Sequence, residues 1–216
     1  MRVSKAAWVV AAAPIALAGC SSDGQLVVDQ SVGITALRSV CPAVGIPDYT
    51  GDITLFSSPT SRTADAIGVV AAMTNVRADC NPDGEQVVSQ VTFDVYGRRT
   101  NTAGARTVEI PYFATVMRGG DSVVSKRVGS VTLNFADGQA RAQAQGTAAA
   151  YVDRAEATLP EDIRERITRK RRAGDADAAV DPLTEPDVRA ALARASFELL
   201  VGFQMSDADL AYNATR

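Results

Sequence analysis

The 216-residue chain contains no histidine, and this absence excludes several kinds of chemistry. Ser-His-Asp and Cys-His catalysis, histidine-ligated zinc sites and acid–base catalysis by an imidazole all need that side chain. Lysine is scarce too. The chain has Lys5, Lys126 and Lys170, and none follows a serine by three residues, so the Ser-x-x-Lys pattern is missing. The sequence has no phosphate-cradling or dinucleotide motif. It therefore predicts a protein that is not an enzyme and uses no cofactor or metal.

Carboxylates are the catalytic groups that remain, because glycoside hydrolysis needs a pair of them and no histidine. Nothing singles out a pair among the acids of the β-rich region, which are Asp94, Glu109, Asp121 and Asp153. The formal net charge is −3, and no zinc-finger or RNA-binding signature is present. We therefore expect no nucleic-acid partner. A carboxylate-based hydrolase stays open, ranked third after the two functions given at the end of this section.

The first nineteen residues have the pattern of an export signal. Arg2 and Lys5 are the only charges, and an apolar stretch from Ala6 to Ala18 is interrupted by Pro14. The stretch is shorter than the roughly twenty apolar residues that a transmembrane helix needs. A positive start followed by a short apolar core is typical of a signal peptide.

The apolar stretch ends in Leu17-Ala18-Gly19-Cys20, which resembles the lipobox of bacterial lipoprotein precursors. The resemblance covers residues 2–20. It implies that residues 1–19 are removed and that Cys20 receives a diacylglycerol thioether and an acylated amino terminus. Several acyl chains would anchor the protein stably in a lipid bilayer. Ser21 follows Cys20 at the position where, in enteric lipoproteins, an aspartate signals retention in the inner membrane. The resemblance therefore implies the periplasmic side of the outer membrane, with the inner membrane as alternative.

The alternatives for this region are an ordinary signal peptide, or an apolar amino-terminal core helix with a chance cysteine. Two further cysteines, Cys41 and Cys80, follow. An even pair in an exported chain usually forms a disulfide. Two free buried thiols or a metal site are the alternatives, and a metal would need additional ligands. Closing a loop of about 39 residues would stabilise the fold by roughly 4 kcal/mol.

From Cys41 onward, apolar alternation and turn signals predict strands. The apolar stretch from Ala66 to Cys80 predicts a central strand buried on both faces. Pro111 predicts an edge strand and Gly129 a β-bulge. Glycine and proline predict turns at residues 81–84, 118–121 and 136–138. The strands are predicted at residues 52–56, 66–80, 87–95, 108–117, 123–128, 131–135, 197–205 and, with helix as alternative, 139–156.

Two helices are predicted before the last strand. The first begins at Pro160 and runs to about Arg172, and the second runs from Pro186 to about Ser196. The first carries a basic cluster that could contact anionic lipid, peptidoglycan carboxylates or an acidic partner. Its other interpretation is a helix with acids first and bases last to suit its dipole. The cluster consists of Arg164, Arg166, Arg169, Lys170, Arg171 and Arg172.

These patterns predict a mainly β protein, an antiparallel, immunoglobulin-like β-sandwich with a helical insertion at about 159–196. The expected division is a signal peptide (1–19), a lipidated tether (20–40), the sandwich domain (41–206) and a polar tail (207–216). The expected function is that of a non-enzymatic, membrane-tethered accessory or assembly subunit of an envelope complex. The alternative is a module that binds a small ligand or glycan through the sandwich loops.

Overall fold

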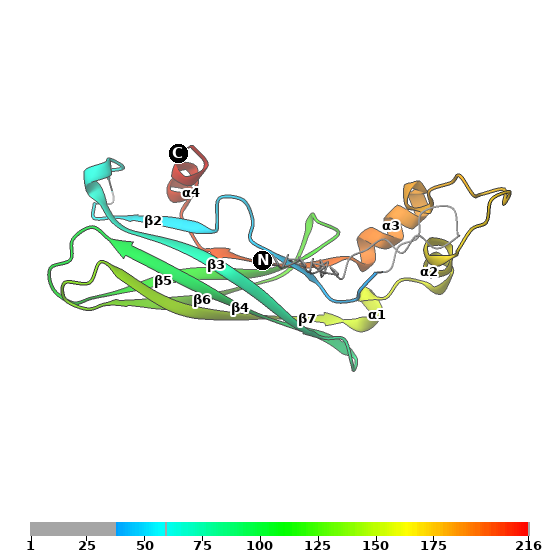
Figure 1. The fold of residues 1–216 in the computed structure, drawn as a ribbon, viewed down its shortest axis with the longest axis horizontal. Helices are drawn as coiled ribbons and strands as arrows, with labels where there is room; N and C mark the ends of the chain where they lie inside the picture. The colour runs from blue at the N-terminus through cyan, green and yellow to red at the C-terminus, as the bar shows by residue number, and fades with distance from the viewer. Residues whose placement is uncertain (1–37, 59, 216) are drawn as a thin grey trace, which may run out of the picture.

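Two four-stranded sheets pack face to face in the computed structural model, and most of the helices gather at one end of the long axis (Figure 1). The structure describes residues 38–58 and 60–215. The expected signal peptide, Cys20 and most of the tether lie outside the described residues. The predicted antiparallel sandwich with a helical insertion before the last strand is confirmed. Within the described residues, no helix has the length and apolar character needed to cross a membrane.

The strand order is β1-β8-β5-β6 in one sheet and β2-β3-β4-β7 in the other. Neighbouring strands are antiparallel except for the short parallel pair β1 and β8. The strands are β1 (Ala43–Gly45), β2 (Asp52–Phe56), β3 (Ile67–Asn81), β4 (Gln86–Arg99), β5 (Arg106–Arg118), β6 (Ser122–Phe135), β7 (Arg141–Asp153) and β8 (Phe197–Phe203). The helices are η1 (Ala64–Ala66), α1 (Arg154–Ala157), α2 (Glu161–Thr168), η2 (Pro182–Thr184), α3 (Pro186–Ala195) and α4 (Asp207–Thr215).

The core between the sheets is filled by alternate residues of each strand, as period two requires. In β8 the buried residues Phe197, Leu199, Val201 and Phe203 alternate with partly exposed ones over most of the strand. In β4 the alternation continues without a break from Val87 to Arg99. The apolar alternation predicted for these two strands is confirmed.

The predicted bulge at Gly129 is wrong, because the segments 123–128 and 131–135 form one strand, β6. Gly129 lies in regular register opposite Tyr112, and the register shift falls instead between Val116 and Met117. A Cβ atom at position 129 would lie 2.6 Å from Tyr112 Cζ. The glycine therefore makes room for the tyrosine ring, which donates a hydrogen bond from its hydroxyl to the carbonyl of Thr147 at 2.5 Å.

The expectation that Pro111 marks an edge strand is also wrong. Strand β5 lies between β6 and β8, and its pairing with β8 stops at Tyr112. Pro111 lies just past that point, where its carbonyl accepts a hydrogen bond from the Gln204 N–H at 2.9 Å. A central strand tolerates a proline here because the neighbouring strand ends and no donor is needed.

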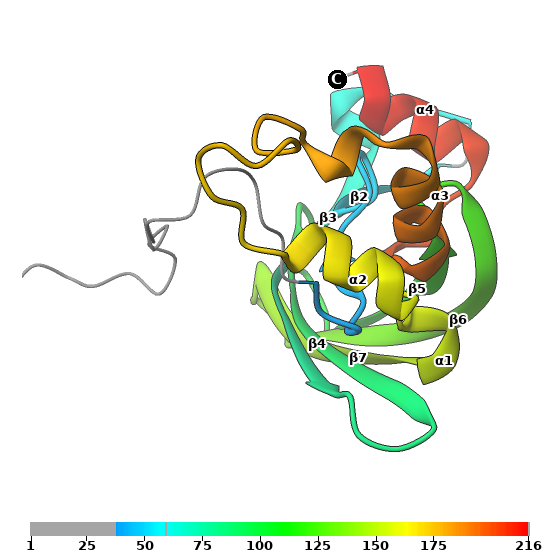
Figure 2. The same cartoon turned by 90° about the vertical axis from the view of Figure 1, so that its right-hand side faces the viewer.

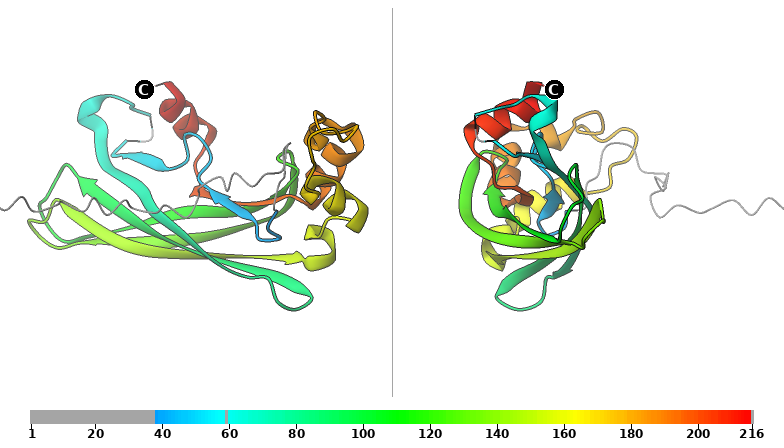
Figure 3. Two further views of the ribbon diagram at one scale, coloured as in Figure 1. Left: turned by 45° about the vertical axis from the view of Figure 1, so that its right-hand side comes forward. Right: turned by 90° about the vertical axis from the view of Figure 1, so that its left-hand side faces the viewer.

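Strand β3 is buried on both faces only in its first part, contrary to prediction. It pairs with β2 from Ile67 to Ala72, and its register with β4 then shifts between Thr74 and Arg77. Asn75 has a left-handed φ of 57° at this shift. Beyond it most side chains are exposed, because β2 has ended and the β3–β4 hairpin projects from the sandwich (Figure 3).

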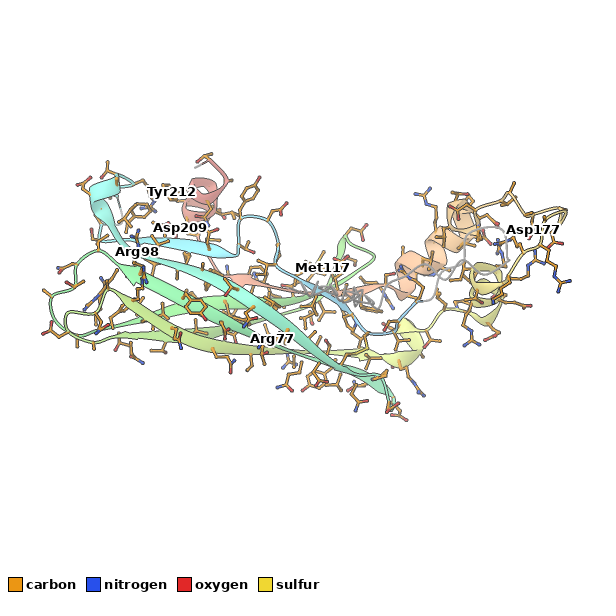
Figure 4. The ribbon with its side chains drawn as sticks, in the orientation of Figure 1. Arg77, Arg98, Met117, Asp177, Asp209 and Tyr212 are labelled. Atoms are coloured by element: carbon orange, nitrogen blue, oxygen red, sulfur yellow. A yellow bond between two sulfur atoms is a disulfide. The ribbon has the colours of Figure 1, made fainter. Side chains whose placement is uncertain are left out.

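Within the expected polar tail, 207–216, residues 207–215 form α4, which packs on β2. Asn213 is buried and donates hydrogen bonds to the carbonyls of Tyr49 at 3.0 Å and Asp52 at 2.7 Å. Tyr212 meets the Phe56 ring edge to face, with centroids 5.1 Å apart, and Figure 4 shows it above β2. The polar composition concealed a helix whose few contacts with the sheet are specific.

Candidate functional site: the helical cap

Residues 154–196, named the helical cap below, have a small hydrophobic core of their own beyond the end of the sandwich. Its buried members come from α2 and α3, which lie side by side in Figure 2, and are Ile163, Ile167, Val188 and Ala191. The cluster of α2 and α3 is separate from the main core, whereas Ala157 of α1 belongs to the main core. The predicted helix from Pro186 is confirmed as α3.

Arg118, the last residue of β5, joins the cap to the sandwich. Its Nη2 donates to Glu156 Oε2 at 2.7 Å, and its Nε donates to the Arg194 carbonyl at 2.9 Å. The guanidinium also lies 5.0 Å from the centroid of the Phe197 ring. One side chain therefore holds α1 and the end of α3 against the sheet.

The predicted helix from Pro160 to Arg172 is shorter than expected, since α2 ends at Thr168. Residues 169–172 follow it as an irregular segment. Arg171 is 3% exposed and donates to the Arg166 carbonyl at 3.1 Å. Because the last carbonyls of a helix lack partners within it, this contact caps the end of α2. The six basic residues therefore do not form one exposed helical face.

Asp177 holds the irregular segment from the loop that follows it. It accepts hydrogen bonds from Arg169 and, at 3.3 Å, from Arg171 Nε. Burial raises the pKa of Asp177, but the hydrogen bonds from Arg171 and Arg169 outweigh burial and bring this pKa below its usual value. Figure 4 places Asp177 at the far end of the cap. Two of the predicted basic residues thus have an acidic partner within the cap.

Arg166 joins α2 to the start of α3. It contacts Glu185, and its Nη1 donates to Asp187 Oδ2 at 2.6 Å. The hydrogen bonds that Arg166 donates to Asp187 and Glu185 raise the pKa of Arg166 above its usual value, and the contact with Arg166 lowers the pKa of Asp187. Arg164 pairs within α2 with Glu161, and that hydrogen bond lowers the pKa of Glu161. These contacts give the basic cluster a structural role through ion pairs within the cap, which differs from the predicted placement of bases in the last turn of a helix.

Acidification is expected to loosen the cap before the sandwich. The folded pKa of Asp187 lies below the ordinary value of about 4, so its ionised form stabilises the folded state above that pH. This stabilisation is lost as the pH falls through the lowered pKa. Amide hydrogen exchange, corrected for intrinsic rates, should therefore show α3 losing protection below about pH 4 while β4 keeps it. Asp187→Asn should reduce this pH dependence, and equal loss in both elements would contradict the prediction.

A cavity of about 190 Å³ lies where the chain enters the cap. One wall is formed by Arg38, Ser39 and Val40, the first described residues, and Arg38 Nη2 donates to Ser196 Oγ at 2.7 Å. The remaining wall comes from α1, α2 and α3 and from residues that follow α1 and α3, namely Ala157, Thr158, Leu159, Arg164, Ile167, Thr168, Leu192, Ala195 and Ser196. The cavity therefore exists only because residues 38–40 lie against the cap.

The predicted disulfide between Cys41 and Cys80 is confirmed. It ties the chain, three residues after Arg38, to the last part of β3. Both cysteines are partly buried and pack against the main core. The wall that residues 38–40 give to the cavity is thus fixed at its downstream end.

The four acids considered for a hydrolase are not brought together. Asp94 accepts a hydrogen bond from Asn75 Nδ2 at 2.5 Å, and Asp153 caps α1 by accepting from the Ala155 N–H at 2.8 Å. Glu109 is in the opposite sheet and Asp121 in the β5–β6 turn. Among residues 38–58 and 60–215, no group of three or more cysteine, aspartate and glutamate side chains is placed to hold a metal ion.

No protein-family model, curated protein or solved structure matches the chain. The candidate site is therefore identified by the cavity between residues 38–40 and the cap. Sequence patterns did not identify the cavity, although apolar residues four apart on α2, Ile163 and Ile167, indicate the face that it partly uses. No local signal links residues 38–40 to Ser196, because their contact spans 158 positions of sequence.

Proposed function

We propose that the mature chain is an envelope lipoprotein, anchored through acylated Cys20, that acts as a non-enzymatic accessory or assembly subunit. The observation that supports this proposal is where the chain enters the domain. Arg38 contacts Ser196 beside the cap, and Cys41 is bonded to Cys80. An anchor attached upstream of residue 38 would therefore lead to the cap end of the sandwich, and the opposite end would point towards partners.

Tethering gives such a subunit its effect without chemistry of its own. Acyl chains on Cys20 would keep the domain at the membrane, which raises its effective concentration near membrane-bound partners. The end of the sandwich away from the cap is closed by the loops 100–105 and 136–140, both fastened to Arg99. We infer that this end of the sandwich is what a partner in an envelope complex contacts.

Replacing Cys20 with serine is expected to release the protein from the membrane. With the thiol lost, no thioether can form, and a domain without its acyl chains has no anchor. The measurement is fractionation of a Gram-negative host, with mass spectrometry of the amino-terminal peptide. The wild type should sediment with membranes and carry an acylated Cys20, and Cys20→Ser should be largely soluble. Ser22→Ala is the matched control and should stay acylated. An unmodified Cys20 still joined to preceding residues would disprove the anchor.

The accessory role needs its own experiment, since an anchored protein can also act alone. Affinity purification from detergent-solubilised envelope should recover the acylated chain with stoichiometric envelope proteins. Recovery of the chain by itself would favour the second candidate function, the binding of a small ligand. That candidate is supported by the cavity at the cap, whose lining combines six apolar residues with two arginines.

A further inference from the structure

We propose that the cavity at the cap binds the alkyl segment of an anionic amphiphile, a carboxylate or phosphate carried on a hydrocarbon chain. This inference goes beyond the tethering role and does not depend on it. It rests on the apolar interior of the cavity, the charge of its rim, its size and its place in the fold.

The interior of the cavity suits hydrocarbon. Ile167 and Ala157, both almost completely buried, contribute to its lining together with four other apolar side chains, and the two threonines of the lining, Thr158 and Thr168, donate their hydroxyl hydrogens to helix carbonyls. The four other apolar residues are Val40, Leu159, Leu192 and Ala195. A sugar would leave the hydroxyl groups that face these six apolar side chains without partners, and this cost argues against a glycan. A hydrocarbon chain loses nothing polar when it enters.

The rim of the cavity suits an anion. None of the twelve lining residues is acidic, and two of them are Arg38 and Arg164. Arg38 forms no ion pair with an acid among the described residues, and its one recorded hydrogen bond leaves most of its donors for a ligand. Arg164 pairs with Glu161 in a contact that is exposed on both sides, with side chains 57% and 74% exposed, so solvent screens it. A carboxylate or phosphate would find two guanidinium groups beside an apolar opening.

Two serine hydroxyls add to this rim. Ser196 Oγ accepts from Arg38, and Ser39 Oγ accepts from the Cys41 N–H at 3.1 Å. Each hydroxyl hydrogen can therefore be donated to an oxygen of the ligand. The rim thus offers hydrogen-bond donors from guanidinium and hydroxyl groups and has no acidic side chain, which favours an anionic head group over a neutral or cationic one.

The size and position of the cavity limit the ligand. A volume of about 190 Å³ is smaller than the roughly 300–1,000 Å³ of sites for drug-sized molecules, so a short alkyl segment fits and a whole diacyl lipid does not. The cavity adjoins Arg38, the point at which the chain enters. One chain of a membrane lipid and a free fatty acid share this chemistry, and the experiment separates the two sources.

The test uses residues 20–216 with Cys20→Ser, which contain every described residue and carry no acyl chain of their own. Calorimetric titration with decanoate, below its micellar range, should give one site per chain, and saturating decanoate should raise the melting temperature. Decyltrimethylammonium, with the same chain and opposite charge, should bind at least about tenfold more weakly, as expected when charge-assisted hydrogen bonds are lost. Binding of both probes with equal affinity, or no binding of decanoate, would overturn the proposal.

Variants locate the site. Ala195→Phe should fill the cavity and abolish decanoate binding. Arg38→Gln, at an exposed position where folding is not at risk, should weaken decanoate about tenfold and leave decanol unchanged. Arg189→Gln, on the exposed side of α3, is the matched control and should bind like the parent. Unchanged binding by Arg38→Gln and Ala195→Phe would place the ligand elsewhere and refute the assignment.

Vesicles identify the source of the ligand. If a membrane lipid supplies the chain, the Cys20→Ser protein should bind phosphatidylglycerol vesicles better than phosphatidylcholine vesicles, and Ala195→Phe should remove the difference. If the ligand is a free amphiphile, decanoate binds and Ala195→Phe does not change vesicle binding. Either result supports the site. Failure of the anchoring proposal would leave these measurements unaffected, because the tested protein is not acylated.

Discussion

Replacing Arg99 with alanine is expected to lower the free energy of unfolding by about 3–5 kcal/mol, among the largest effects of any single substitution in the described chain. Arg99 is 3% exposed and donates four hydrogen bonds, each 2.8 Å long, to backbone carbonyls. The acceptors lie in the loops 100–105 and 136–140. Alanine would remove this donor from all four carbonyls, and among the described residues only those of Thr102 and Ala136 would keep a backbone donor, the N–H of Gly138 and of Gln139. Urea denaturation followed by circular dichroism measures the loss.

The matched control for this substitution is the residue immediately before it in β4. Arg98 is exposed, and Arg98→Ala should change the free energy of unfolding by no more than about 0.5 kcal/mol. Arg99→Lys keeps the charge but has a single ammonium where the guanidinium has a planar fork, so most of the loss should remain. Arg99→Ala with a stability within about 1 kcal/mol of the wild type would show that water replaces the four bonds.

Buried arginines close both ends of the molecule. Arg99 fastens two loops at one end, and Arg171 fastens the segment after α2 at the other. In each case the guanidinium donates to backbone carbonyls, which belong to two loops for Arg99 and to the last turn of α2 for Arg171. The sequence contains 19 arginines, and composition alone does not distinguish those that are buried in this way from those at the surface.

Strands with alternating burial were predictable, because an alternation of apolar and polar residues indicates a strand with one buried face. This applies to β4 and β8. Whether a strand is central or at an edge depends on which strands pair with it, and residues far away in sequence decide that. Pro111 was therefore misread. The small apolar residues of β3 suit a buried strand, yet residues 74–81 extend past the end of β2.

The candidate site was predictable in part. Besides Cys20 the sequence has two cysteines, which allow a single pairing, so the disulfide Cys41–Cys80 could be predicted in advance. The basic cluster could not be fully interpreted from its own segment, because three of the four acids that pair with it lie further along the chain, at Asp177, Glu185 and Asp187. The cavity needs residues 38–40 to lie against three helices, and no local pattern encodes that approach.

Removing the disulfide is expected to lower the free energy of unfolding by roughly 4 kcal/mol, because the bond closes a loop between residues 39 positions apart. The double variant Cys41→Ala, Cys80→Ala avoids a leftover thiol. In urea denaturation, the free energy of unfolding of the variant should be close to that of the wild type measured in reductant. Adding reductant should not change the value for the variant. A stability equal to that of the oxidised wild type would mean that packing around Cys41 holds the entering chain without the bond.

The same variant connects stability to the proposed ligand site. Cys41 fixes residues 38–40, which form one wall of the cavity, so the loss of the bond should weaken decanoate binding while the cap helices stay folded. Arg99→Ala provides the comparison, since it destabilises the sandwich at the opposite end. Under conditions where both variants are folded, weakened binding by the cysteine variant alone would show that the bond positions the wall. Equal weakening in both would assign the effect to general instability instead.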